Sequence, residues 1–217
     1  ATFGSVNFGA RKNLIGHDLY RYQFGFTITD EDGNVLRNAA NAQADVETPA
    51  TDTEDMSESA PITFGELRYS NADDDKTFTY YLQETDRGRP GYTYDDTRYK
   101  VEVTPHDNGD GTMSCDVVYY DENNQVITGG NTQDSQVIFE NSYKATGSFS
   151  LQGLKNLDGG QLTDGQFEFE IGKVVTSDDG STTFEAISTA TNNADGTIYF
   201  DELGLTQRDA GKTYLYA

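Results

Sequence analysis

Apolar and polar residues alternate along much of the chain, in short runs separated by turn-forming residues. Five runs, at 23–29, 77–83, 99–104, 114–120 and 136–143, have strand length and are rich in β-branched and aromatic residues. Asp-Gly, Asn-Gly and Gly-Gly dipeptides punctuate the chain between such runs, which is typical of hairpin turns. No segment has a helical period. The pattern predicts an all-β chain built as a two-sheet sandwich, broadly immunoglobulin-like.

A segment near the N-terminus occurs twice. The pattern KNLxGxxLxxxQFxFxI begins at Lys12 and again, without a gap, at Lys155. A second pattern, IxFxEL, begins at Ile62 and recurs at Ile198. The spacing between the two patterns is longer in the first copy, where the acidic, Ala/Thr/Ser-rich stretch 39–61 is predicted to be a surface loop.

The two copies differ in extent. The first continues to about Tyr143, whereas the second reaches Ala217 soon after its counterpart of Lys76-Thr77. We therefore predict one complete β-sandwich at 1–144 and the first half of a second, homologous repeat at 145–217. Half a sandwich leaves strand edges and a core uncovered, so the missing strands are expected from another chain or from a longer parent molecule.

Three predicted strands each place one polar residue among apolar ones. Alternate residues of a strand share a face. The sets that share a face are Val6, Phe8, Ala10, Lys12 and Leu14; Phe78, Tyr80, Leu82 and Glu84; Val137, Phe139, Asn141 and Tyr143; and, in the second copy, Phe149, Leu151, Gly153, Lys155 and Leu157. Lys12, Glu84 and Asn141 are thus predicted to point into the core.

Two interpretations of these three residues stay open on spacing alone. The first is a buried Lys–Glu pair with Asn as a hydrogen-bonding neighbour, with strand ends that let the side chains reach water. The second is chemical. A desolvated Lys12 loses its proton and becomes a nucleophile, and a desolvated Glu84 stays protonated and polarises the carbonyl of Asn141. The amine then displaces ammonia, and an amide joins Lys12 to Asn141.

Four motifs, in order, resemble those of the Gram-positive pilin isopeptide-linkage domain found in streptococcal backbone pilins. They are the KNL opening, the YYLQET run that contains Glu84, the PGYTYD segment followed by YxVxV, and the closing FENSY that contains Asn141. The resemblance implies a Cna-B-like sandwich in which Lys12 is the nucleophile, Asn141 the acceptor and Glu84 the catalytic acid. For the second copy it implies a linkage lysine at Lys155, with the partners of that lysine outside the sequence.

Composition narrows the classes of function. A net charge of −22 argues against nucleic acids and anionic membranes as partners. No run is apolar enough to span a membrane, and no signal peptide opens the chain, so targeting and anchoring segments of a secreted protein are expected outside it. A single cysteine, Cys115, excludes an internal disulfide. We expect no cofactor and no metal, and neighbouring repeats or pilin subunits as partners at a bacterial cell surface.

We predict a load-bearing stalk or shaft repeat of a bacterial surface pilin or adhesin, and three other functions are weighed against it. A ligand-binding adhesin module could use tyrosines to stack on sugars, although Tyr92, Tyr94, Tyr119 and Tyr120 are better explained as packing residues. Calcium could bind at 30–33 or 107–111, but neither loop has full ligand spacing, so both are predicted to be turns. His17 and His106 lack a nucleophile motif, which disfavours a hydrolase.

Overall fold

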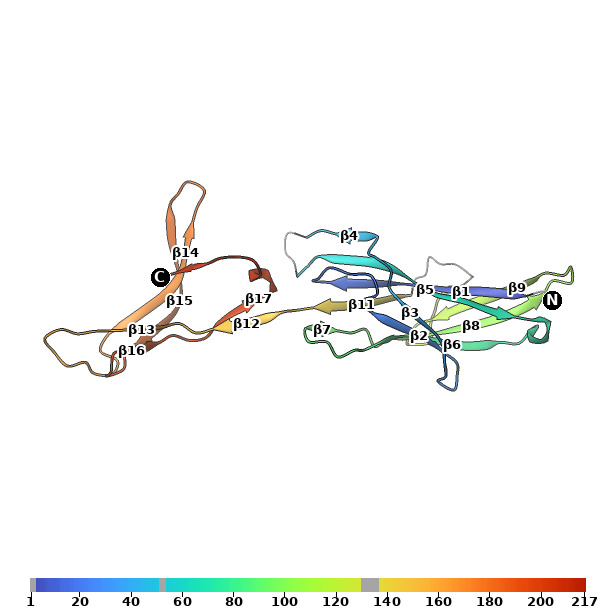
Figure 1. Cartoon of the computed structure of the whole chain (residues 1–217), viewed down its shortest axis with the longest axis horizontal. Coiled ribbons are helices and arrows are strands. Elements are labelled where there is room, and N and C mark those ends of the chain that lie inside the picture. Colours follow the sequence, from blue (N-terminus) through green and yellow to red (C-terminus); the bar gives the residue numbers. More distant parts are fainter. Residues whose placement is uncertain (1–2, 51–53, 130–136) are drawn as a thin grey trace. The chain divides into compact units, whose positions relative to one another are not determined.

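A computed structural model describes residues 3–50, 54–129 and 137–217, whose regular secondary structure is almost entirely β-strand (Figure 1). The chain divides into two compact units, Ala1–Lys144 and Ala145–Ala217. Within the described ranges, no helix is long and apolar enough to cross a membrane. The all-β prediction is confirmed.

Unit 1 contains two sheets. In the first sheet the order is β4-β5-β1-β11-β7, and in the second it is β10-β9-β8-β6-β2-β3. The strands are β1 (Gly4–Ile15), β2 (Gly25–Thr29), β3 (Val35–Ala40), β4 (Val46–Thr48), β5 (Ser57–Tyr69), β6 (Phe78–Thr85), β7 (Tyr92–Thr93), β8 (Arg98–Asp107), β9 (Met113–Tyr120), β10 (Val126–Gly129) and β11 (Ile138–Tyr143). All five predicted runs contain a strand, although residue 136 of the last run lies outside the described residues.

The two sheets of unit 1 face each other across one hydrophobic core. The fully buried side chains come from both layers: Phe8, Leu14, Ile62 and Phe139 from the first sheet, and Phe26, Leu82, Val101 and Tyr119 from the second. Figure 1 shows β1, β5 and β11 in one layer and β2, β6 and β8 in the other. The sandwich prediction is therefore confirmed, and any polar side chain on an inner face is removed from water.

A bulge lets β5 keep its apolar residues inside. The β1–β5 pairing shifts register between Asn7 and Gly9, opposite Gly65. Gly65 has φ +87°, a conformation that residues with a Cβ rarely adopt. Because of the extra residue, Phe64 and Leu67 both point into the core although they are three positions apart.

The predicted surface loop at 39–61 is wrong in part. β3 ends at Ala40, β4 pairs with the first three residues of β5, and β5 already begins at Ser57. β4 lies at the edge of its sheet and all three of its residues are exposed. An edge strand without a buried face has no apolar alternation, so its sequence does not distinguish it from a loop.

Unit 2 repeats the strand pairing of the first half of unit 1. Its strands are β12 (Thr146–Phe149), β13 (Gln152–Leu154), β14 (Glu168–Thr176), β15 (Thr182–Thr191), β16 (Thr197–Tyr199), β17 (Leu203–Thr206) and β18 (Leu215–Tyr216). Gly153 pairs with Ile198 as Ala10 pairs with Ile62. The order β15-β14-β18 corresponds to β3-β2-β6 of unit 1.

A short turn is also repeated. The 3₁₀ turns η1 (Asn71–Asp73) and η2 (Gln207–Asp209) each carry a capping box, from Ser70 with Asp73 and from Thr206 with Asp209. The repeat seen in the sequence therefore extends to the side-chain-to-backbone hydrogen bonds that cap these turns.

Candidate functional site

The three polar residues on inner strand faces meet in the core of unit 1. Lys12 on β1 and Asn141 on β11 come from adjacent parallel strands, in which Lys12 pairs with Phe139 and Leu14 with Asn141. Glu84 comes from β6 in the opposite sheet. Their exposed fractions are 0% for Lys12, 5% for Glu84 and 1% for Asn141. The prediction that all three point inward is confirmed.

The carboxylate of Glu84 contacts the nitrogens of both other residues. Lys12 Nζ donates to Glu84 Oε2 at 3.1 Å, and Asn141 Nδ2 donates to Glu84 Oε1 at 2.9 Å. One carboxylate thus bridges an amine and a carboxamide that are 129 residues apart in sequence. This arrangement differs from the expected one in a single respect, because Glu84 contacts the amide nitrogen of Asn141 and not its carbonyl oxygen.

Burial shifts both ionisable groups toward their neutral forms. Desolvation lowers the pKa of Lys12 to about 8, although the carboxylates of Glu84, Asp95 and Glu140 favour its charged form. Desolvation also raises the pKa of Glu84 above its usual range, against the opposing effect of Lys12. A neutral amine beside a protonated acid is the state that nucleophilic attack requires.

An aromatic ring and a buried asparagine complete the surroundings of Lys12. Lys12 Nζ lies 4.7 Å from the ring centre of Phe24. The backbone N–H of Phe24 donates to Asn41 Oδ1 at 2.9 Å, and Asn41 Nδ2 donates to the carbonyls of Tyr20 and Ala42, both at 2.8 Å. Asn41 is fully buried. It therefore fixes the backbone that carries the ring over the amine.

Asp95, like Asn41, is a residue of the site that the sequence did not predict. Its backbone N–H donates to Asn141 Oδ1 at 2.8 Å, and its carboxylate accepts the N–H of Glu140 at 2.7 Å. In the sequence, Asp95 closes the PGYTYD motif and reads as one more acidic residue in a polar loop. Only the fold brings it to the acceptor side chain.

Lys155 lies in surroundings like those of Lys12. Its Nζ is 4.7 Å from the ring centre of Phe167. The N–H of Phe167 donates to Asn192 Oδ1 at 2.8 Å, and Asn192 is buried like Asn41. Lys155 itself is half-buried. It belongs to unit 2, whereas Glu84 and Asn141 both belong to unit 1.

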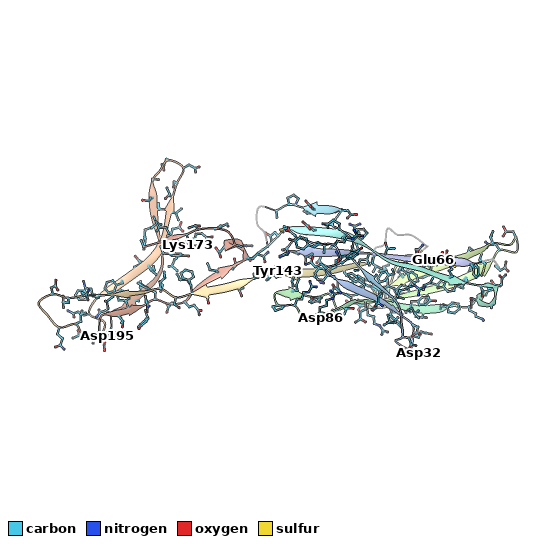
Figure 2. The ribbon with its side chains drawn as sticks, viewed as in Figure 1. Asp32, Glu66, Asp86, Tyr143, Lys173 and Asp195 are labelled. Atoms are coloured by element: carbon cyan, nitrogen blue, oxygen red, sulfur yellow. The ribbon has the colours of Figure 1, made fainter. Side chains whose placement is uncertain are left out.

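The other residues singled out in the sequence have structural explanations. Tyr119 is buried in the core, Tyr94 packs edge-on against Phe24, and Tyr120 donates to Glu102. Asp30 accepts the backbone N–H groups of Asp32 and Asn34 in the β2–β3 loop, where Figure 2 shows Asp32. The second acidic loop likewise forms the β8–β9 turn.

The two histidines and the cysteine belong to separate surroundings. His17 stacks edge-on against Tyr143 near the end of β11 (Figure 2), with ring centres 4.8 Å apart. His106 contacts the carboxylates of Asp75 and Asp116. Cys115 is half-buried against the core, as expected of a small packing residue.

Comparison with known proteins assigns the family. Residues 8–144 match the family described as Spy0128-like isopeptide containing domain (FctA), so the chain belongs to this family. The resemblance drawn from the four motifs is confirmed. No curated protein sequence matches the chain.

Solved structures that resemble the chain include two of major pilins from Streptococcus pyogenes. The major pilin protein T-13 from Streptococcus pyogenes has 18% identity and a TM-score of 0.42, covering 96% of this chain and 83% of that one. A mutant of the major pilin from Streptococcus pyogenes has 14% identity and a TM-score of 0.38, covering 97% and 90%.

Proposed function

We propose that unit 1 is a shaft domain of a bacterial surface pilin or adhesin, stapled by an amide that forms without any enzyme between Lys12 and Asn141. The observation that carries the proposal is the buried carboxylate of Glu84, which contacts the nucleophilic nitrogen and the leaving nitrogen at once. A plain Lys–Glu ion pair does not require the carboxamide on the second oxygen.

The reaction balances within these three side chains. The neutral amine of Lys12 attacks Cγ of Asn141, and a new C–N bond forms. Glu84 takes a proton from Nζ at Oε2 and gives one to Nδ2 at Oε1. The Cγ–Nδ2 bond breaks, ammonia leaves, and Glu84 ends the reaction as it began.

The site supplies proximity and dryness. The fold fixes both reactants at the ends of hydrogen bonds to one carboxylate, which replaces a bimolecular encounter by an internal one. Glu84 and Asp95 also line a pocket beside the β6–β8 connection.

The staple would connect the first and last strands of unit 1. β1 and β11 are neighbours in one sheet, and the bond would lie across that parallel pair. Tension applied along the chain at both ends would then pass through a covalent bond instead of sliding β1 past β11. The chain acts on itself once, so we regard it as structural rather than as an enzyme that turns over.

Lys155 is proposed as the corresponding lysine of a second, homologous repeat. The repeated contacts of Phe167 and Asn192 support this equivalence. We expect neighbouring repeats or other pilin subunits as partners and a location at the bacterial cell surface.

Peptide mapping tests the proposal. After digestion of the folded chain, tandem mass spectrometry should find one branched peptide in which the segments containing Lys12 and Asn141 are joined, with one ammonia missing. Two separate peptides with unmodified masses from folded protein would refute the cross-link.

A further inference from the structure

The acceptor side chain is approached by a segment that runs along the free edge of β11. Tyr92 and Thr93 of β7 pair with Tyr143 and Ser142, and the N–H of Lys144 donates to the carbonyl of Gly91 at 2.8 Å. Gly91 has φ +85°, and a Cβ there would lie 2.7 Å from the Tyr143 ring. A glycine is therefore needed for this approach.

Asp95 follows this segment and holds Asn141 through two separate groups. Its backbone N–H donates to Asn141 Oδ1 at 2.8 Å. Its carboxylate accepts the N–H of Glu140 through Oδ2 at 2.7 Å and that of Thr97 through Oδ1 at 2.9 Å. One residue thus binds the acceptor carbonyl and the peptide group next to it in the chain.

The Asp95 contact also fixes how the carboxamide of Asn141 is oriented. A backbone N–H can only donate, so the atom that it contacts is the carbonyl oxygen and the nitrogen faces Glu84. Glu84 is left with the two nitrogens, between which protons must move. The polarisation of the carbonyl needs a different donor.

We propose that the backbone N–H of Asp95 is the oxyanion donor of the cross-linking reaction, and that its carboxylate is a positioning group that holds β11 in register for attack. This assignment rests on the proposed function. When Nζ of Lys12 attacks Cγ of Asn141, the C=O electron pair moves onto Oδ1, and the N–H already directed at Oδ1 stabilises that charge. The charge returns to the carbonyl as ammonia leaves, so the donor is unchanged.

The carboxylate acts through geometry rather than charge. Its negative charge favours the protonated form of Lys12, which works against nucleophilic attack. What it supplies is an acceptor for Glu140 at a position where β7 no longer pairs with β11. Asparagine at this position keeps one acceptor oxygen, which can face the N–H of Glu140, and gives up the contact with the N–H of Thr97.

Three substitutions at one position separate these roles. Asp95→Pro removes the N–H donor together with the clamp on Glu140, and Asp95→Ala removes the clamp alone. Asp95→Asn keeps the N–H and an acceptor oxygen for Glu140, but not the acceptor for Thr97. Asp96→Ala, at an exposed neighbour, is the matched control. Each full chain is made by cell-free synthesis, and the loss of ammonia is followed by intact mass over time. Circular dichroism on the same samples reports whether each variant folds.

The expected order of rates follows from the number of contacts retained. Loss of one oxyanion donor slows acyl transfer by about 100- to 1,000-fold, so we expect a reduction of that size in Asp95→Pro. Asp95→Ala should be slowed by a smaller factor, and Asp95→Asn and Asp96→Ala should react within a few-fold of the original chain. If Asp95→Pro does not fold, Asp95→Ala against Asp95→Asn still decides the positioning role.

The outcomes distinguish this inference from the proposed function. If the original chain never loses ammonia, the proposed function fails and Asp95 has no reaction to assist. If the original chain reacts, and both Asp95→Pro and Asp95→Ala fold and react as fast as the original chain, only the role of Asp95 is overturned. Slower reaction in folded Asp95→Ala with recovery in Asp95→Asn supports it.

Discussion

The stability contributed by the proposed staple can be measured with a pair of substitutions that remove its chemistry and its charges together. Lys12→Met with Glu84→Leu replaces the buried ion pair by apolar side chains of similar size. Such replacements of buried ion pairs are often neutral or stabilising by about 1–4 kcal/mol. A loss of stability in this double variant therefore reports the missing covalent bond together with the buried Nδ2 of Asn141, which loses its acceptor at a cost of about 1–3 kcal/mol.

The size of the loss follows from the loop that the bond closes. Lys12 and Asn141 are 129 residues apart. By the chain-entropy relation for cross-links, closing a loop of this length stabilises the fold by about 5 kcal/mol. For a domain of this size each kcal/mol shifts the midpoint by roughly 2–4 °C, so we expect Tm to fall by roughly 10–20 °C.

The single change Glu84→Ala should lower the stability of the fold more than the double variant does. It removes the staple and also leaves Lys12 buried without its partner, which adds about 3–5 kcal/mol. The combined loss approaches the whole stability of an ordinary domain, about 5–15 kcal/mol. Glu84→Ala is therefore expected to fold poorly, whereas Lys12→Met with Glu84→Leu should fold well.

Calorimetry and intact mass on the same samples test these expectations. The matched control is Lys100→Met with Glu102→Leu, which makes the same two changes in a half-exposed ion pair on β8. The control should still lose one ammonia and should melt within a few degrees of the original chain. The reasoning is refuted if the core double variant retains its ammonia yet melts as high as the control.

Three further predictions follow from the site. In Asn141→Ala, Lys12 stays unlinked, and the free energy of unfolding should rise as the pH increases from about 8 to 9.5. The pKa of Lys12 is about 8 in the folded chain and about 10.4 in the unfolded chain, so in this pH range the unfolded chain binds more protons. Denaturant titrations at each pH measure the free energy of unfolding, and adding Lys12→Met should abolish the rise. Asn41→Ala should lower stability by about 2–4 kcal/mol, because it leaves the partners of three hydrogen bonds unpaired, whereas the exposed Asn38→Ala should change it by less than about 0.5 kcal/mol in the same unfolding assay. Lys155 should remain open to amine-modifying reagents in this chain, and its appearance in a branched peptide with any residue of the chain would contradict its assignment.

The alternation of residues between the two faces of each strand made the core of the site predictable. Lys12 follows three alternate apolar residues on β1, and every member of that set is buried. Alternation along a strand does not say which strands become neighbours, and the fold supplies that information. The parallel pairing of β1 with β11, and the approach of β6 from the other sheet, place Glu84 between two nitrogens.

Asn41 and Asp95 were not predictable because their sequence surroundings are ordinary. Asn41 lies where the spacing between the two copies changes, so a comparison without gaps does not align it with Asn192. Asp95 acts partly through its backbone N–H, a group that every residue except proline carries. Such a contribution depends on where the chain runs and leaves no signature in residue type.

The positions of the three reacting residues also make the proposed bond a consequence of correct folding. Lys12 and Asn141 meet only when the first and last strands of unit 1 pair, and Glu84 reaches them only when the second sheet packs onto the first. Desolvation, which moves the pKa of Lys12 down and that of Glu84 up, is complete only in the packed sandwich. In an unfolded or mispaired chain the amine is charged, the acid is ionised and the carboxamide is distant. The staple would thus form only on chains whose core is already assembled, and would make that arrangement permanent.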